Sequence, residues 1–225
     1  MSDAEYVGIG SFHRELRLKG DSMQDLGESI PGYSYGKAEV SLSPVSLPEL
    51  EQLKISTGFT EQDWQSLRLA GEVLADQAEK IVNHWRIGII ASIPHLAAHS
   101  RTSEGKPIPE YLAKSNLRFQ QWITDTCLRP YDQDWLNYQQ EIALRHTAVK
   151  KNQTDGVHST PYVPLSDIVA FVAVINETIK PYLASKRHTS EEVEMMHRAW
   201  CKSMQLQMAL WVKPYMEASR VSSEG

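Results

Sequence analysis

The stretch that decides the fold reads YDQDWLNYQQEIALRHTAVKK and covers residues 131–151. Its apolar and aromatic residues recur at steps of three and four, which is the period of one helix face. The residues on this face are Trp135, Tyr138, Ile142, His146 and Val149. The spacing predicts an amphipathic helix over residues 132–151 that carries the imidazole of His146 on its buried face.

The charged residues Arg145, Lys150 and Lys151 fall away from this face, so we expect them to stay in solvent. An inward imidazole can coordinate iron with one ring nitrogen while the other nitrogen donates a hydrogen bond. A more common role for such a histidine is structural, with the ring packed in the core and bonded to a backbone carbonyl. The spacing alone therefore leaves both roles of His146 open.

Helical periodicity also dominates the rest of the chain, and strand patterns are nearly absent. We expect further helices over residues 46–56, 64–91, 110–127, 165–184 and 188–212. Residues 1–46 are rich in glycine, serine and polar groups and contain the turn signal Pro31-Gly32. These patterns predict one all-α domain of seven or eight helices. We expect a partly ordered N-terminal extension over residues 1–46, the helical domain over 47–216 and a flexible tail over 217–225.

Composition excludes several classes of function. The net charge is −5 and the pI is about 5.9, so no basic surface is available and we expect no nucleic-acid partner. Cys127 and Cys201 form no C-x-x-C pair, which argues against a zinc ribbon and a covalently attached c-type haem. No apolar run is long enough to span a bilayer, and two isolated cysteines fit a reducing compartment. We therefore expect a cytoplasmic protein that does not enter the membrane.

Several separated blocks of the sequence resemble the protoglobin family. Pro31-Gly-Tyr-Ser-Tyr-Gly36 resembles the family's P-G-Y-x-Y-G block, and Glu141-Ile-Ala-Leu-Arg-His146 resembles the block around its iron-binding histidine. Other resembling blocks lie at residues 70–77, 131–139, 150–155, 180–184, 188–193 and 206–211. The resemblance extends over about residues 30–216. It implies a globin fold with an additional N-terminal helix and extension.

The resemblance also implies a noncovalent haem b (iron protoporphyrin IX), with His146 as the proximal ligand of the iron. Phe119, Phe171 and Ile175 match residues that wall the family's haem pocket. Ordinary core packing would explain the same apolar residues, and both roles can hold together because a haem is itself packed like a core. The residues that we expect to contact the haem are Trp85, Arg86, Ile87, Phe119, Ile142, Phe171 and Ile175.

One block departs from the family's pattern. Relatives usually read W-Y-G at the distal end of the long helix, and the tyrosine can hydrogen-bond an iron-bound ligand. This chain reads Trp85-Arg-Ile-Gly88, with one extra residue and no tyrosine. Either Arg86 or Ile87 takes the tyrosine's place, depending on where the extra residue is absorbed. A donor such as arginine favours bound O₂ or an anion, whereas an apolar pocket favours CO or NO relative to O₂.

The leading hypothesis for function is reversible binding of O₂, CO or NO at the haem iron, for gas sensing or gas handling. The family dimerises through its last two long helices, so the resemblance implies a homodimer through residues 165–184 and 189–212, although core packing would explain their apolar residues equally well. One alternative is a haem enzyme that uses the same iron as an NO dioxygenase, a nitrite reductase or a peroxidase-like catalyst. Another is a haem-free helical interaction module.

Overall fold

The computed structural model describes the backbone of residues 30–223 and the side chains of residues 30–217. Within this part of the chain the fold is all-α, as predicted, with eight α-helices and one isolated β-bridge. The helices are α2 (Leu47–Ser56), α3 (Glu61–Leu74), α4 (Ala78–Asn83), α5 (Pro94–Ala98), α6 (Pro109–Leu128), α7 (Gln133–Leu144), α8 (Leu165–Leu183) and α9 (Ser190–Ser223). The predicted extension, residues 1–46, lies outside the described residues up to residue 29.

Between α4 and α5 the chain forms a π-helical segment, η1 (His84–Ile89), followed by a short 3₁₀ turn, η2 (Ile90–Ser92). The single helix predicted over residues 64–91 is therefore wrong, because α3 ends at Leu74. At the break, the side chain of Gln77 donates to the carbonyls of Val73 (2.7 Å) and Tyr182 (3.2 Å). The apolar periodicity continues across the break because α3 and α4 both pack against α6.

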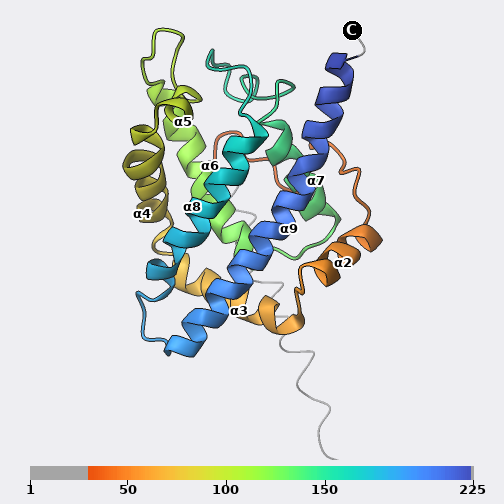
Figure 1. Ribbon diagram of the computed structural model, residues 1–225, viewed down its shortest axis with the longest axis vertical. Helices are drawn as coiled ribbons and strands as arrows, with labels where there is room; N and C mark the ends of the chain where they lie inside the picture. Colours follow the sequence, from red (N-terminus) through yellow and green to blue (C-terminus); the bar gives the residue numbers. More distant parts are fainter. Residues whose placement is uncertain (1–29, 224–225) are drawn as a thin grey trace, which may run out of the picture.

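The longest helix, α9, crosses the molecule diagonally and lies beside α8 (Figure 1). It continues to Ser223 instead of ending near residue 212, and it also packs against α3 and α7. The centre of the core contains the fully buried indoles of Trp85, Trp135 and Trp200. α9 thus packs against both α7 and α8, the helices that position the residues described below.

Residues 30–46, directly before α2, are not helical, yet they pack closely against the helices. The hydroxyl of Tyr33 donates to the buried carboxylate of Asp125 on α6, at 2.7 Å. Arg118 and Arg145 donate to the carbonyls of Pro31 and Gly32, each at 2.7 Å. Residues 31–33 therefore lie against the second half of α6 and the end of α7.

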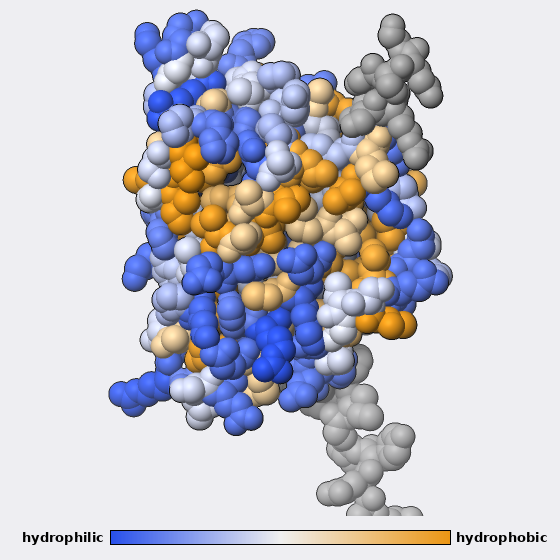
Figure 2. Space-filling view, in the orientation of Figure 1, coloured by the Kyte–Doolittle hydropathy of each residue, from blue (hydrophilic) through white to orange (hydrophobic). Residues whose placement is uncertain are grey.

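Hydrophobic side chains gather over α8 and α9 on the face shown in Figure 2. Val169 on α8 and Met216 on α9 are 51% and 54% exposed, which is high for large apolar residues. None of the helices in the described part of the chain is both long and apolar enough to cross a membrane.

Candidate functional site

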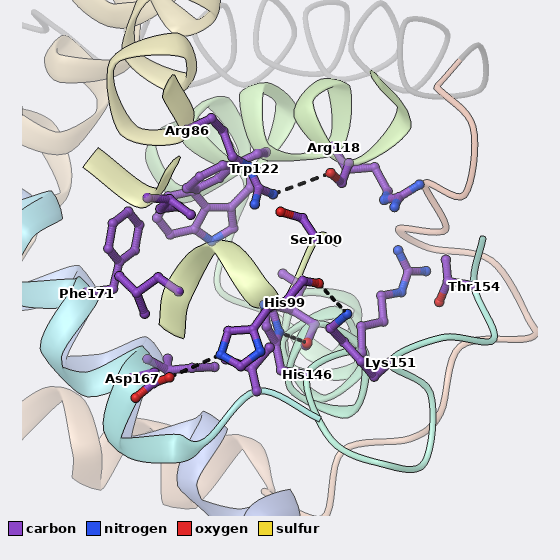
Figure 3. A pocket seen from close by; sticks show the side chains of 18 of the residues that line it. Arg86, His99, Ser100, Arg118, Trp122, His146, Lys151, Thr154, Asp167 and Phe171 are labelled. Atoms are coloured by element: carbon purple, nitrogen blue, oxygen red, sulfur yellow. Dashed lines mark hydrogen bonds and ion pairs between the residues drawn. The ribbon is translucent and has the colours of Figure 1, made fainter. Parts of the chain in front are cut away.

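A cavity of about 240 Å³ lies between α6, the end of α7, the first half of α8 and the segment from Arg86 to Ser100 (Figure 3). Its apolar walls come from Leu96, Phe119, Ile142, Ile168, Phe171 and Ile175. Its polar groups come from Arg86, His99, Arg118, His146, Lys151 and Asp167. An apolar pocket with a few convergent polar groups is the usual form of a ligand site.

The structure brings six of the eight predicted site residues to this cavity. They are Arg86, Phe119, Ile142, His146, Phe171 and Ile175. Trp85 lies behind the wall, fully buried, with its ring centroid 5.2 Å from that of Phe119. Ile87 is 72% exposed and does not line the cavity.

The helix that carries His146 is shorter than predicted. α7 ends at Leu144, and the backbone N–H of His146 donates to Ala143 in a tighter turn beyond it. Val149, placed by the sequence on the same buried face, is 49% exposed because it no longer follows the helical period. His146 reaches the cavity from the turn that follows α7.

The ring of His146 is held in one orientation. Its Nδ1 donates to the carbonyl of Ile142 at 2.8 Å, one turn earlier on α7. Burial lowers the pKa of His146 to about 4, so the imidazole is neutral near pH 7. A neutral imidazole that donates through Nδ1 keeps a lone pair on Nε2, and no other group in the described residues bonds to that nitrogen. This is the state in which histidine binds a metal.

The described residues contain no cluster of three or more His, Cys, Asp or Glu side chains that could hold a metal ion. A single imidazole is too few ligands for a bare metal ion, because protein sites normally supply three or four. It is sufficient for an iron whose other ligands come from a porphyrin. The donor set at this cavity therefore fits a haem better than a free metal ion.

Lys151 differs from its prediction, since its side chain is buried instead of solvated. Its Nζ donates to the carbonyl of His99 (2.9 Å) and to the hydroxyl of Ser159 (2.8 Å). No carboxylate in the described residues forms an ion pair with it, and burial lowers its pKa to about 8. Because α7 ends before residue 151, the helical wheel that placed Lys151 in solvent does not apply.

Two other cationic groups at the cavity have acidic partners. Arg118 forms a two-point ion pair with Asp155, with nitrogen–oxygen distances of 2.5 and 3.1 Å. Arg145, which was also expected in solvent, pairs with Glu141 at 2.9 Å. Both guanidinium groups also donate to the segment before α2, at Pro31 and Gly32. Their charges are balanced by the two carboxylates.

Arg86 enters the cavity because of the π-helical segment. A π turn holds one more residue than an α turn, and η1 contains Trp85-Arg-Ile-Gly88. Arg86, directly after Trp85, faces the cavity, and Ile87 faces outward. The Nη2 of Arg86 donates to the hydroxyl of Ser115 at 3.4 Å, and its guanidinium lies 5.3 Å from the ring centroid of Phe119.

His99 also lies at the cavity, although it was not predicted as a site residue. Its Nδ1 is 2.8 Å from the hydroxyl of Thr160, and its Nε2 is 3.1 Å from the carboxylate of Asp167. These partners lie more than sixty positions away along the chain, so no local pattern could reveal them. Ser115 was also missed, but it stands four residues before Phe119, a spacing that places both on one helix face.

A family model described as Protoglobin matches residues 47–220. The match includes every helix from α2 to α8, most of α9, and all the cavity residues named above. No curated protein matches the chain in a comparison by sequence.

Proposed function

The chain belongs to the protoglobin family, and from this premise we propose that it holds a haem in the cavity and reversibly binds a diatomic gas at the iron. The gas is O₂, CO or NO, and the role is gas sensing or gas handling. The observation that carries the proposal is the neutral imidazole of His146, whose Nδ1 donates to Ile142 while Nε2 stays free toward the cavity.

In this proposal His146 binds the iron through Nε2. The hydrogen bond from Nδ1 to the carbonyl of Ile142 holds the ring in one tautomer and one orientation, as it does at many metal-binding histidines. The bond spans one helical turn at the end of α7, so the ligand is held by rigid backbone. The pocket needs no movement of His146 to accept a metal.

The walls suit the flat apolar body of a haem. Phe119, Phe171 and Ile175 present aromatic and aliphatic surface to the cavity and keep water from the iron. Cys127 and Cys201 do not line the cavity, so covalent attachment through a thioether has no partner there. A noncovalent haem b fits this lining.

We assign Lys151 to a carboxylate group of the haem. It is a buried cation that lines the cavity without an ion-pair partner, and an ammonium group has three donors, of which two are used. Its nitrogen lies 5.1 Å from the ring centroid of Tyr111, which also lines the cavity. A carboxylate beside Lys151 would supply the missing countercharge.

We further propose a homodimer formed through α8 and α9. The exposed apolar side chains of Val169 and Met216 belong to these helices, and core packing does not explain exposed groups. Sedimentation of the haem-loaded protein tests this, with Val169→Glu expected to give monomers. Ile55→Glu is the matched control, because Ile55 is 78% exposed and belongs to α2 instead of α8 or α9. A wild-type monomer, or equal effects of both variants, would reject the interface.

The experiment that tests the main proposal is the visible absorption spectrum of the haem-supplemented protein in its ferric, ferrous and CO-bound forms. We expect a Soret band that shifts with reduction and with CO. His146→Gly should lose this spectrum, and added imidazole should restore it. His158→Ala is the matched control, because His158 is exposed and lies outside the cavity. The absence of a Soret band from the wild type would overturn the proposal and favour a haem-free helical module.

A further inference from the structure

The guanidinium of Arg86 is a positive charge inside the cavity without a countercharge. No carboxylate in the described residues forms an ion pair with it. Its only hydrogen bond there is the 3.4 Å contact from Nη2 to Ser115, and its Nε is buried with no partner. Almost all buried polar groups in proteins are bonded, so an unpaired donor in a cavity needs a partner that the chain itself does not supply.

The other cations of the cavity do not share this property. Arg118 and Arg145 are balanced by Asp155 and Glu141. Lys151 has no ion pair, but a buried lysine can become neutral by losing a proton. An arginine cannot do this, because its guanidinium stays charged in proteins. An unpaired charge in a cavity is costly, and no carboxylate in the described residues balances the one on Arg86.

The surroundings of Arg86 restrict the size and the position of such an anion. The guanidinium is flanked by the ring of Phe119, and the chain before it is fixed by the buried Trp85. Figure 3 shows Arg86 and His146 entering the cavity from opposite sides in that view. A ligand that contacts both Arg86 and a metal held by His146 would therefore lie between these two sides of a cavity of about 240 Å³.

We propose that Arg86 makes this cavity a binding site for a small monovalent inorganic anion, of the class of fluoride, azide and nitrite. The inference rests on the proposed haem function, because the iron held by His146 is the anion's second contact. Arg86 binds the anion by charge-assisted hydrogen bonds, which are about twice as strong as those between neutral groups. The chain thereby differs from a gas-binding pocket with an uncharged donor.

The test is a titration of the haem-loaded ferric protein with fluoride, followed by visible absorption. Fluoride is the probe because it carries one charge and only accepts hydrogen bonds. We expect Arg86→Met to weaken fluoride binding about tenfold or more, since a charged hydrogen bond contributes about 1.5–3 kcal/mol. Arg86→Lys should recover part of the affinity. Ile87→Ala, in the same π-helical segment but facing solvent, should leave the dissociation constant unchanged.

A second readout separates loss of the charge from general damage to the pocket. CO is neutral, so its affinity for the ferrous protein should fall far less in Arg86→Met than fluoride affinity does. A normal Soret spectrum with fluoride affinities within twofold for wild type and Arg86→Met would overturn the inference and leave the haem proposal intact. Equal losses of CO and fluoride affinity in Arg86→Met would also overturn it, because they would show that Arg86 only packs the pocket. A wild type without a Soret band would instead overturn the haem proposal itself.

Discussion

The indole nitrogen of Trp85 donates a 2.8 Å hydrogen bond to the hydroxyl of Thr178. Trp85 is the second residue of η1, and Thr178 lies on α8, so the bond ties the π-helical segment to the helix whose first half lines the cavity. The hydroxyl of Thr178 in turn donates to the carbonyl of Val174 at 2.7 Å. Arg86 follows Trp85 directly, and its direction therefore depends on this anchor.

Replacing Thr178 by valine keeps the shape of the side chain but removes the acceptor. The indole N–H of Trp85, which is fully buried, then has no partner. We expect Thr178→Val to lower the free energy of unfolding by about 1–3 kcal/mol. Thr178→Ser keeps the hydroxyl and should lose less than half as much. Urea denaturation measures both, and equal stabilities of the two variants would show that the bond contributes nothing.

Two neighbouring tyrosines before α2 should respond in opposite ways to the loss of a hydroxyl. The hydroxyl of Tyr33 donates to Asp125, which also binds Arg129, whereas the hydroxyl of Tyr35 is buried without a partner. We expect Tyr33→Phe to cost about 1.5–3 kcal/mol, because the bond goes to a charged group. Tyr35→Phe removes an unsatisfied group and should be neutral or stabilising.

Chemical denaturation of the two variants checks this prediction, with the wild type as reference. The rings of Tyr33 and Tyr35 stack with centroids 6.5 Å apart, so both substitutions perturb the same aromatic cluster. A difference between them therefore reports on the hydroxyls alone. Similar losses in both variants would mean that the bond to Asp125 does not stabilise the fold.

Much of the fold follows from local patterns in the sequence. The bounds of α6 and α8 match the prediction to within one residue, because both helices have regular periodicity and are bounded by prolines or turns. The end of α7 could not be predicted in this way. No glycine or proline stands near Leu144, and the chain leaves the helix where Arg145 binds Gly32 and Ser34. Contacts with such distant residues leave no local signal.

The candidate site, too, could be predicted from local sequence patterns only in part. The apolar residues Phe119, Phe171 and Ile175 line the cavity, and their positions follow helix periodicity and the family's blocks. Sequence could not choose between Arg86 and Ile87, because the choice depends on a π turn that no propensity predicts. That any of these residues contacts a haem stays a prediction, which the experiments proposed above test.

Gly71 on α3 packs directly against α6. A Cβ atom at this position would lie 2.6 Å from Cδ2 of Leu128 and 2.8 Å from Cβ of Cys127. Alanine normally stabilises a helix by about 1 kcal/mol relative to glycine, but forcing extra volume into a packed core costs about 1–3 kcal/mol or more. We expect Gly71→Ala to lower the melting temperature, because Cβ of Cys127 cannot move without its helix.

The matched control is Gly88→Ala. Its added Cβ would meet only Cδ2 of His84 at 3.2 Å, on an exposed side chain that can move. Its melting temperature should stay near that of the wild type. A Gly71→Ala protein as stable as Gly88→Ala would mean that α3 and α6 can separate at little cost.

The lowered pKa of Lys151 predicts that haem binding depends on pH. Burial lowers its pKa from 10.5 to about 8 in the protein without ligand, so the ammonium group loses its proton above this pH. A haem carboxylate beside it would raise the pKa again. Below pH 8 the amine of Lys151 is protonated both with and without haem, so the haem affinity does not change with pH through this group. Above pH 8 binding must take up a proton, so haem affinity falls, by up to about tenfold per pH unit.

Haem loss to an excess of a scavenging globin, measured from pH 7 to pH 10, tests this assignment. Lys151→Arg keeps a charge that does not titrate in this range, so its retention of haem should stay flat where that of the wild type falls. Lys151→Met should lose haem about tenfold faster than the wild type at pH 7 and show no added loss above pH 8. The assignment would be wrong if haem loss depended on pH equally in the wild type and in Lys151→Arg, and if Lys151→Met retained haem as well as the wild type. The haem carboxylates would then contact other residues.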